Sequence, residues 1–105
     1  MAAVTLKITR ASSDDVFRSA TILYRLNAAR DAVLHQTFIA FNGQDTFEVQ
    51  ELEGFAYKLV VHVFGPPGAN IEVTVKKGET TLVNKLKAEI ATGASVTRRT
   101  KTFEL

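Results

Sequence analysis

The chain has 105 residues, of which 46% are hydrophobic and 23% are charged, and its formal net charge is +2 at pH 7. This composition is typical of one globular domain and excludes an intrinsically disordered chain. The absence of cysteine excludes a disulfide scaffold, a thiol nucleophile and a thiolate metal site. The small net charge does not support specific nucleic-acid binding. We therefore expect a single domain spanning residues 1–105.

Residues 1–10 alternate polar and apolar types, which is unlike a signal peptide. The chain has no apolar run near the roughly 20 residues that a membrane-spanning helix needs. We expect no transmembrane segment, and either a cytoplasmic location or release without a cleaved signal peptide.

The alternating pattern over residues 3–10 predicts a half-buried strand. Residues 16–27 fit two structures. Ser12 and Asp15 are suited to capping a helix, but the β-favouring residues that recur two apart favour a strand. We predict a strand there.

Residues 32–41 and 45–52 alternate again, and the pair Asn42-Gly43 between them is a strong signal for a hairpin turn. On the returning strand we expect Phe47 and Val49 to face inward. The two segments therefore predict consecutive antiparallel strands.

The clearest strand covers residues 55–64, and its second half is apolar on both faces apart from His62. A strand facing water on one side keeps that side polar, so Val60, His62 and Phe64 are predicted to be covered by a second layer or by another subunit. We treat these three residues as a candidate interface.

The turn over residues 65–70 contains two prolines and leads into a strand at 71–77. Residues 80–92 again fit either a helix that ends at Gly93 or a strand, and their threonines and valine favour the strand. Residues 95–104 form the last predicted strand.

These elements predict an all-β fold, an antiparallel β-sandwich of 7–8 strands. The pattern resembles immunoglobulin-, C2- and transthyretin-like sandwiches in architecture. That resemblance includes no diagnostic motif and assigns no functional residue.

The sequence offers few groups for catalysis. His35 and His62 lack the spacing of a metal site, and no serine lies in a nucleophile motif. The carboxylate pairs Asp14-Asp15 and Glu51 with Glu53 are expected in solvated loops. We therefore expect no enzymatic activity, no metal and no cofactor.

Two features indicate binding instead. The N-terminal strand, if it lies at a sheet edge, carries little charge to prevent pairing with another chain. Arg98, Arg99 and Lys101 form a basic cluster suited to an anionic partner. Tyr24 and Tyr57 are further candidates for contact with a sugar, although a core or rim position is the alternative.

The sequence thus favours a non-enzymatic interaction or structural module that self-associates into an oligomer or larger assembly. The alternative is a ligand-binding module that recognises glycans or anionic lipid surfaces.

Overall fold

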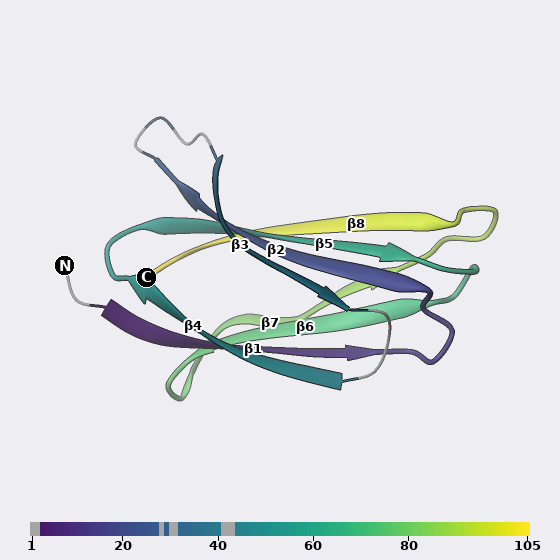
Figure 1. Cartoon of the computed structure of the whole chain (residues 1–105), viewed down its shortest axis with the longest axis horizontal. Helices are drawn as coiled ribbons and strands as arrows, with labels where there is room; N and C mark the ends of the chain where they lie inside the picture. Colours follow the sequence, from purple (N-terminus) through teal and green to yellow (C-terminus); the bar gives the residue numbers. More distant parts are fainter. Residues whose placement is uncertain (1–2, 28, 30–31, 41–43) are drawn as a thin grey trace.

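The computed structural model describes residues 3–27, 29, 32–40 and 44–105, and over 32–40 it describes the backbone alone. These residues form two antiparallel sheets packed face to face, so the predicted β-sandwich is confirmed (Figure 1). The strands are β1 (Ala3–Ser12), β2 (Arg18–Leu26), β3 (Ala32–Ala40), β4 (Gln44–Leu52), β5 (Ala56–Phe64), β6 (Asn70–Lys77), β7 (Thr80–Glu89) and β8 (Val96–Glu104).

The first sheet has the strand order β4-β1-β6-β7, and the second has β3-β2-β5-β8. Every neighbouring pair is antiparallel. Consecutive strands β1 and β2 lie in different sheets, whereas the first two strands of an immunoglobulin constant domain share one sheet. The chain therefore crosses between the layers at its first connection.

Both segments that fitted either helix or strand are strands. In β2, Ser19, Thr21 and Leu23 are buried at alternate positions, and the strand is bonded to β3 and β5. In β7, Val83 and Ala88 are buried, and a bulge between them breaks the period of two. Because of that bulge, the buried residues Val83 and Ala88 are an odd number of positions apart. The predicted turn Asn42-Gly43 lies outside the described residues.

The expectation that the N-terminal strand forms an edge is wrong. β1 is hydrogen-bonded to β4 on one side and to β6 on the other. The described edge strands are β4 and β7 in the first sheet and β3 and β8 in the second. Pairing with strands far along the chain therefore protects β1 without any need for charge on it.

The core lies between the sheets and consists mainly of aliphatic side chains from alternate positions. Tyr57 and Phe103 extend it at one end, with ring centroids 5.9 Å apart. Strand β5 contributes an unbroken inward row, because every second side chain from Tyr57 onward is fully buried. The other fully buried aliphatic residues include Leu6, Ile8, Leu23, Val73 and Val75.

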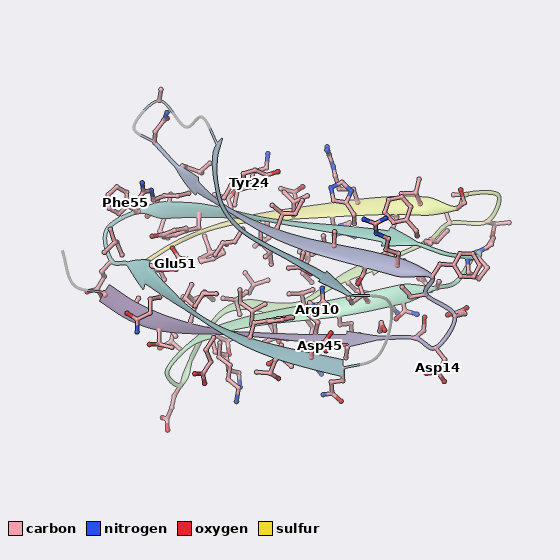
Figure 2. The ribbon with its side chains drawn as sticks, viewed as in Figure 1. Arg10, Asp14, Tyr24, Asp45, Glu51 and Phe55 are labelled. Atoms are coloured by element: carbon pink, nitrogen blue, oxygen red, sulfur yellow. The ribbon has the colours of Figure 1, made fainter. Side chains whose placement is uncertain are left out.

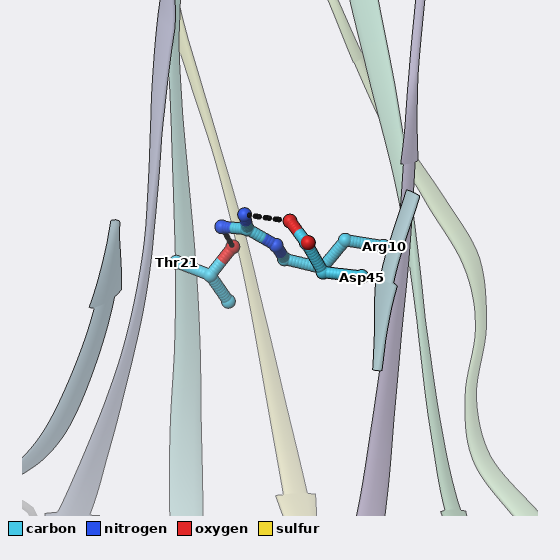
Figure 3. Close-up of polar contacts among 3 residues, drawn as sticks. All are labelled: Arg10, Thr21 and Asp45. Atoms are coloured by element: carbon cyan, nitrogen blue, oxygen red, sulfur yellow. Dashed lines mark hydrogen bonds and ion pairs between the residues drawn. The ribbon is translucent and has the colours of Figure 1, made fainter. Parts of the chain in front are cut away.

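Two charged side chains of the described residues, Arg10 and Glu51, are buried. Arg10 of β1 is 1% exposed, and its guanidinium donates hydrogen bonds to Asp45 Oδ2 at 2.8 Å and to Thr21 Oγ1 at 3.2 Å (Figure 3). The guanidinium carbon also lies 5.2 Å from the centre of the Phe47 ring. Because Thr21 belongs to the second sheet, Arg10 connects the two layers. The alternation of residues 3–10 did not indicate that a charged residue of this strand would be buried.

Tyr57 gives the fold a pH dependence at alkaline pH. Its hydroxyl accepts a hydrogen bond from Leu52 N–H and donates one to Leu52 C=O, both at 3.0 Å. Burial raises the pKa of Tyr57 above its ordinary 10.0, and nearby Glu51 raises this pKa further. The unfolded chain therefore loses this proton first as pH rises, and stability that is complete below pH 10.0 falls through the raised pKa.

We expect Tyr57→Phe to flatten that alkaline loss of stability, measured by urea denaturation between neutral pH and pH 11. At neutral pH the variant should be less stable by about 1 kcal/mol, because the partly buried Leu52 N–H loses its acceptor. An unchanged alkaline slope would show that other groups cause it.

Candidate functional site

The candidate interface residues lie on the outer face of the second sheet, and their exposure differs. Val60 is only 6% exposed, because Ile22 and Thr100 flank it in register on β2 and β8. His62 is half-buried, whereas Phe64 is 41% exposed at the end of β5. Val60 is therefore buried within the single chain and Phe64 is not, and cover of these residues by a second layer or another subunit stays a prediction.

The exposed large hydrophobic residues among those described gather at one end of this sheet. They are Phe17, Phe64 and Val96, exposed by 69%, 41% and 48%. Phe64 and Val96 are direct cross-strand partners on β5 and β8. Phe17 precedes β2, and its backbone N–H donates to Phe64 C=O at 2.8 Å. We call these three residues the corner surface.

Charges of both signs border the corner surface. Asp14 and Asp15 are exposed in the connection just before Phe17, and Figure 2 shows Asp14 at this end of the sandwich. Arg18 on β2 is the cross-strand partner of Phe64 on β5, and Arg98 lies two residues after Val96 on β8. The corner is therefore an apolar centre with acidic and basic residues beside it.

The basic cluster predicted on the last strand is divided between two surfaces. Arg98 pairs with His62, whose side chain is on the outer face. Arg99 and Lys101 pair with Val61 and Leu59, whose side chains are fully buried on the inner face. Because successive side chains alternate across a strand, Arg98 cannot act with the other two on one surface.

A shallow hollow of about 350 Å³ lies on the outer face of the first sheet, over β1, β6 and β7. We call it the face hollow. It contains three lysines, three threonines and one asparagine, and no carboxylate. Its lining residues are Lys7, Thr9, Thr74, Lys76, Thr81, Asn84 and Lys85.

A second hollow, of about 510 Å³, follows the line where the edge strands β7 and β8 meet. We call it the seam hollow. Lys85 and Lys87 from β7 face Arg99 and Lys101 from β8 across it. Asn84 and Lys85 line both hollows, so the two form one continuous basic surface around the edge of the sandwich.

The residues shared by the hollows form the bulge of β7. Val75 pairs with Val83 and Val73 with Leu86, so Asn84 and Lys85 together oppose Thr74. Lys85 has a φ of 49° and is the one non-glycine residue with positive φ in the described chain. Its N–H donates to Thr74 Oγ1 at 3.3 Å. Bulges redirect side chains, and this one turns two polar residues into the basic surface.

Most of this basic surface was missed in the sequence. The lysines come from strands far apart in the chain, and each strand by itself shows only a solvated face. Glu51 was also misplaced, since it is 2% exposed in β4 and lies near Tyr57 instead of in a loop. Figure 2 shows it at the end of the sandwich opposite Asp14. Glu53 is half-buried and forms an ion pair with Lys77 at 2.9 Å.

Within the described residues, histidine, aspartate and glutamate side chains form no group of three or more that is arranged to hold a metal ion. The same residues include no helix with the length and apolar character needed to cross a membrane. The class defined by the fold is therefore an all-β sandwich with an apolar corner and a basic edge. Comparison of the chain with protein-family models, with curated proteins and with solved structures finds no match.

Proposed function

We propose that this protein is a non-enzymatic interaction module that self-associates through the corner surface. The observation that carries the proposal is the convergence of Phe17, Phe64 and Val96, the exposed large hydrophobic residues of the described chain, at one place. Contiguous exposed apolar side chains favour contact with another protein surface, because their burial removes apolar area from water.

The charges beside the corner favour a second copy of the chain as the partner. In a two-fold contact the same patch is present on both subunits, so each patch must complement itself. Asp14 and Asp15 on one copy can face Arg18 and Arg98 on the other, while the apolar centres meet. A patch bordered by one sign of charge would instead repel its own copy.

Strand addition is a less suitable route to assembly at the edges β7 and β8. These two strands carry lysines and arginines, and β7 also contains the bulge. Both features prevent pairing of edge strands. The support for self-association comes from side chains at the corner.

Sedimentation velocity over a range of concentrations tests the proposal. A contact centred on three side chains is small, so we expect reversible dimers that form at high micromolar concentration. Added salt should weaken the dimer moderately by screening the rim charges. A strict monomer up to millimolar concentration would contradict the proposal.

A further inference from the structure

We propose that the basic surface around the edge of β7 binds a sulfated oligosaccharide. The surface consists of Lys7, Lys76, Lys85, Lys87, Arg99 and Lys101, together with the polar residues between them. It is separate from the corner surface, and the proposal does not depend on self-association.

The charges of the two hollows favour an anionic ligand. The two hollows bring six cations together from β1, β6, β7 and β8 without a carboxylate in their linings. In the part of the chain that the structure describes, none of the six forms an ion pair, whereas Lys77 and Arg10 both do. The strand pairing places Glu48 opposite Lys7 and Glu72 opposite Lys87. The six cations outnumber these two carboxylates, and the excess of positive charge favours an anionic ligand.

The backbone conformation of Lys85 also favours a ligand site. An L-residue at positive φ is unfavourable, and glycine or asparagine is the usual occupant of such a position. Here a lysine occupies it at the junction of the two hollows. Unfavourable backbone conformations concentrate at ligand sites, where they place a functional side chain.

The shape of the basic surface favours a flexible linear ligand over a flat membrane. Lys7 and Lys76 project from the outer face of the first sheet, because the residues that alternate with them point into the core. Arg99 and Lys101 begin on the inner side of β8 and line the seam. The cations therefore follow the surface around an edge, where a flexible linear anion can contact them all and a flat membrane cannot.

The polar residues favour a sugar over other linear anions. Thr9, Thr74, Thr81 and Asn84 supply hydroxyl and amide groups that both donate and accept hydrogen bonds. Sugar hydroxyls use both kinds of partner, whereas polyphosphate only accepts at neutral pH. Neither hollow is lined by an aromatic residue, although single-stranded nucleic acid is held mainly by aromatic stacking.

The test is calorimetric titration of the full chain with a heparin-derived hexasaccharide at several salt concentrations. Lys85→Asn removes the charge and retains a residue that accepts positive φ. We expect about tenfold weaker binding and a salt dependence lowered by about one ion contact. Lys58→Asn, on the outer face of the other sheet, is the matched control and should bind like the wild type. If Lys85→Asn and Lys58→Asn weakened hexasaccharide binding equally, the proposed binding site would be wrong.

Two further variants test the path of the ligand. Lys7→Asn and Lys101→Asn alter opposite ends of the surface, and both should weaken the hexasaccharide. A disaccharide is too short to reach both ends and should respond to no more than one of them. A disaccharide sensitive to both variants would overturn the extended path around the edge.

Competing probes test the class of ligand. Polyphosphate, single-stranded RNA and phosphatidylserine vesicles should each bind more weakly than the hexasaccharide at equal ionic strength. Tighter binding of any one of them would overturn the assignment to a sulfated sugar.

Lys85→Gly tests the backbone argument separately. It should raise the melting temperature while it weakens the hexasaccharide, because glycine accepts positive φ without strain. A lower melting temperature would overturn the argument from strain. Phe64→Glu should leave sugar binding unchanged, so a failure of self-association remains distinguishable from a failure of this proposal.

Discussion

Phe64→Glu is expected to convert the self-associated protein to monomers. The side chain is 41% exposed in the isolated chain, so its replacement removes little of the core. At a contact it would place two carboxylates in an apolar centre, and central aromatic residues commonly contribute about 2 kcal/mol or more to binding. The dissociation constant should rise by about thirtyfold or more, measured by sedimentation equilibrium.

The matched control is Thr102→Glu. Thr102 is exposed on the outer face of the same sheet, at the far end from the corner. The substitution adds the same negative charge as Phe64→Glu. Self-association of Thr102→Glu should equal that of the wild type. If Phe64→Glu also dimerises like the wild type while remaining folded, the corner surface is not the contact.

Asp45→Ala is expected to destabilise the fold more than removal of its buried partner does. The variant leaves the Arg10 guanidinium buried with the Thr21 hydroxyl and the Phe47 ring as neighbours. Loss of one partner of a buried ion pair costs about 3–5 kcal/mol. Asp45 is 39% exposed, which lets water replace part of its interaction, so the lower end of that range applies.

Arg10→Met should cost less, since an apolar side chain fills much of the same space and Asp45 can be hydrated. The double variant should resemble Arg10→Met alone, which would reveal strong coupling between the two sites. Glu48→Ala, an exposed carboxylate on the same strand β4, should change the free energy of unfolding by about 0.5 kcal/mol or less. Urea denaturation measures all four variants. A smaller loss for Asp45→Ala than for Arg10→Met would contradict this account.

The strands and their inward faces were predictable from local patterns. Phe47 and Val49 face inward, as alternation indicated, and β2 is a strand because its β-favouring residues recur two apart. In β7 the apolar pattern fitted a helix as well as a strand. The bulge at Asn84 and Lys85 interrupts the two-residue alternation of that strand. A bulge depends on the partner strand, so one strand's sequence does not reveal it.

The candidate sites were predictable to a smaller extent. Phe64 was identified from its position on a doubly apolar strand, but Phe17 and Val96 join it only through strand pairing. Arg98 and Arg99 are neighbours in sequence and lie on opposite faces of β8. Their proximity in the sequence indicated one shared binding site. Because side chains alternate along a strand, the two arginines instead lie on different surfaces.

The amino-acid sequence by itself determined that this chain is a β-sandwich, because side-chain alternation is a local property with a period of two residues. Only the tertiary structure decided that β1 is an inner strand, that Arg10 is buried against Thr21, and that lysines from four strands surround Lys85. Each of these depends on which distant segments pair and in which register. Pairing and register minimise the free energy of the whole chain, so they are not encoded in any one segment.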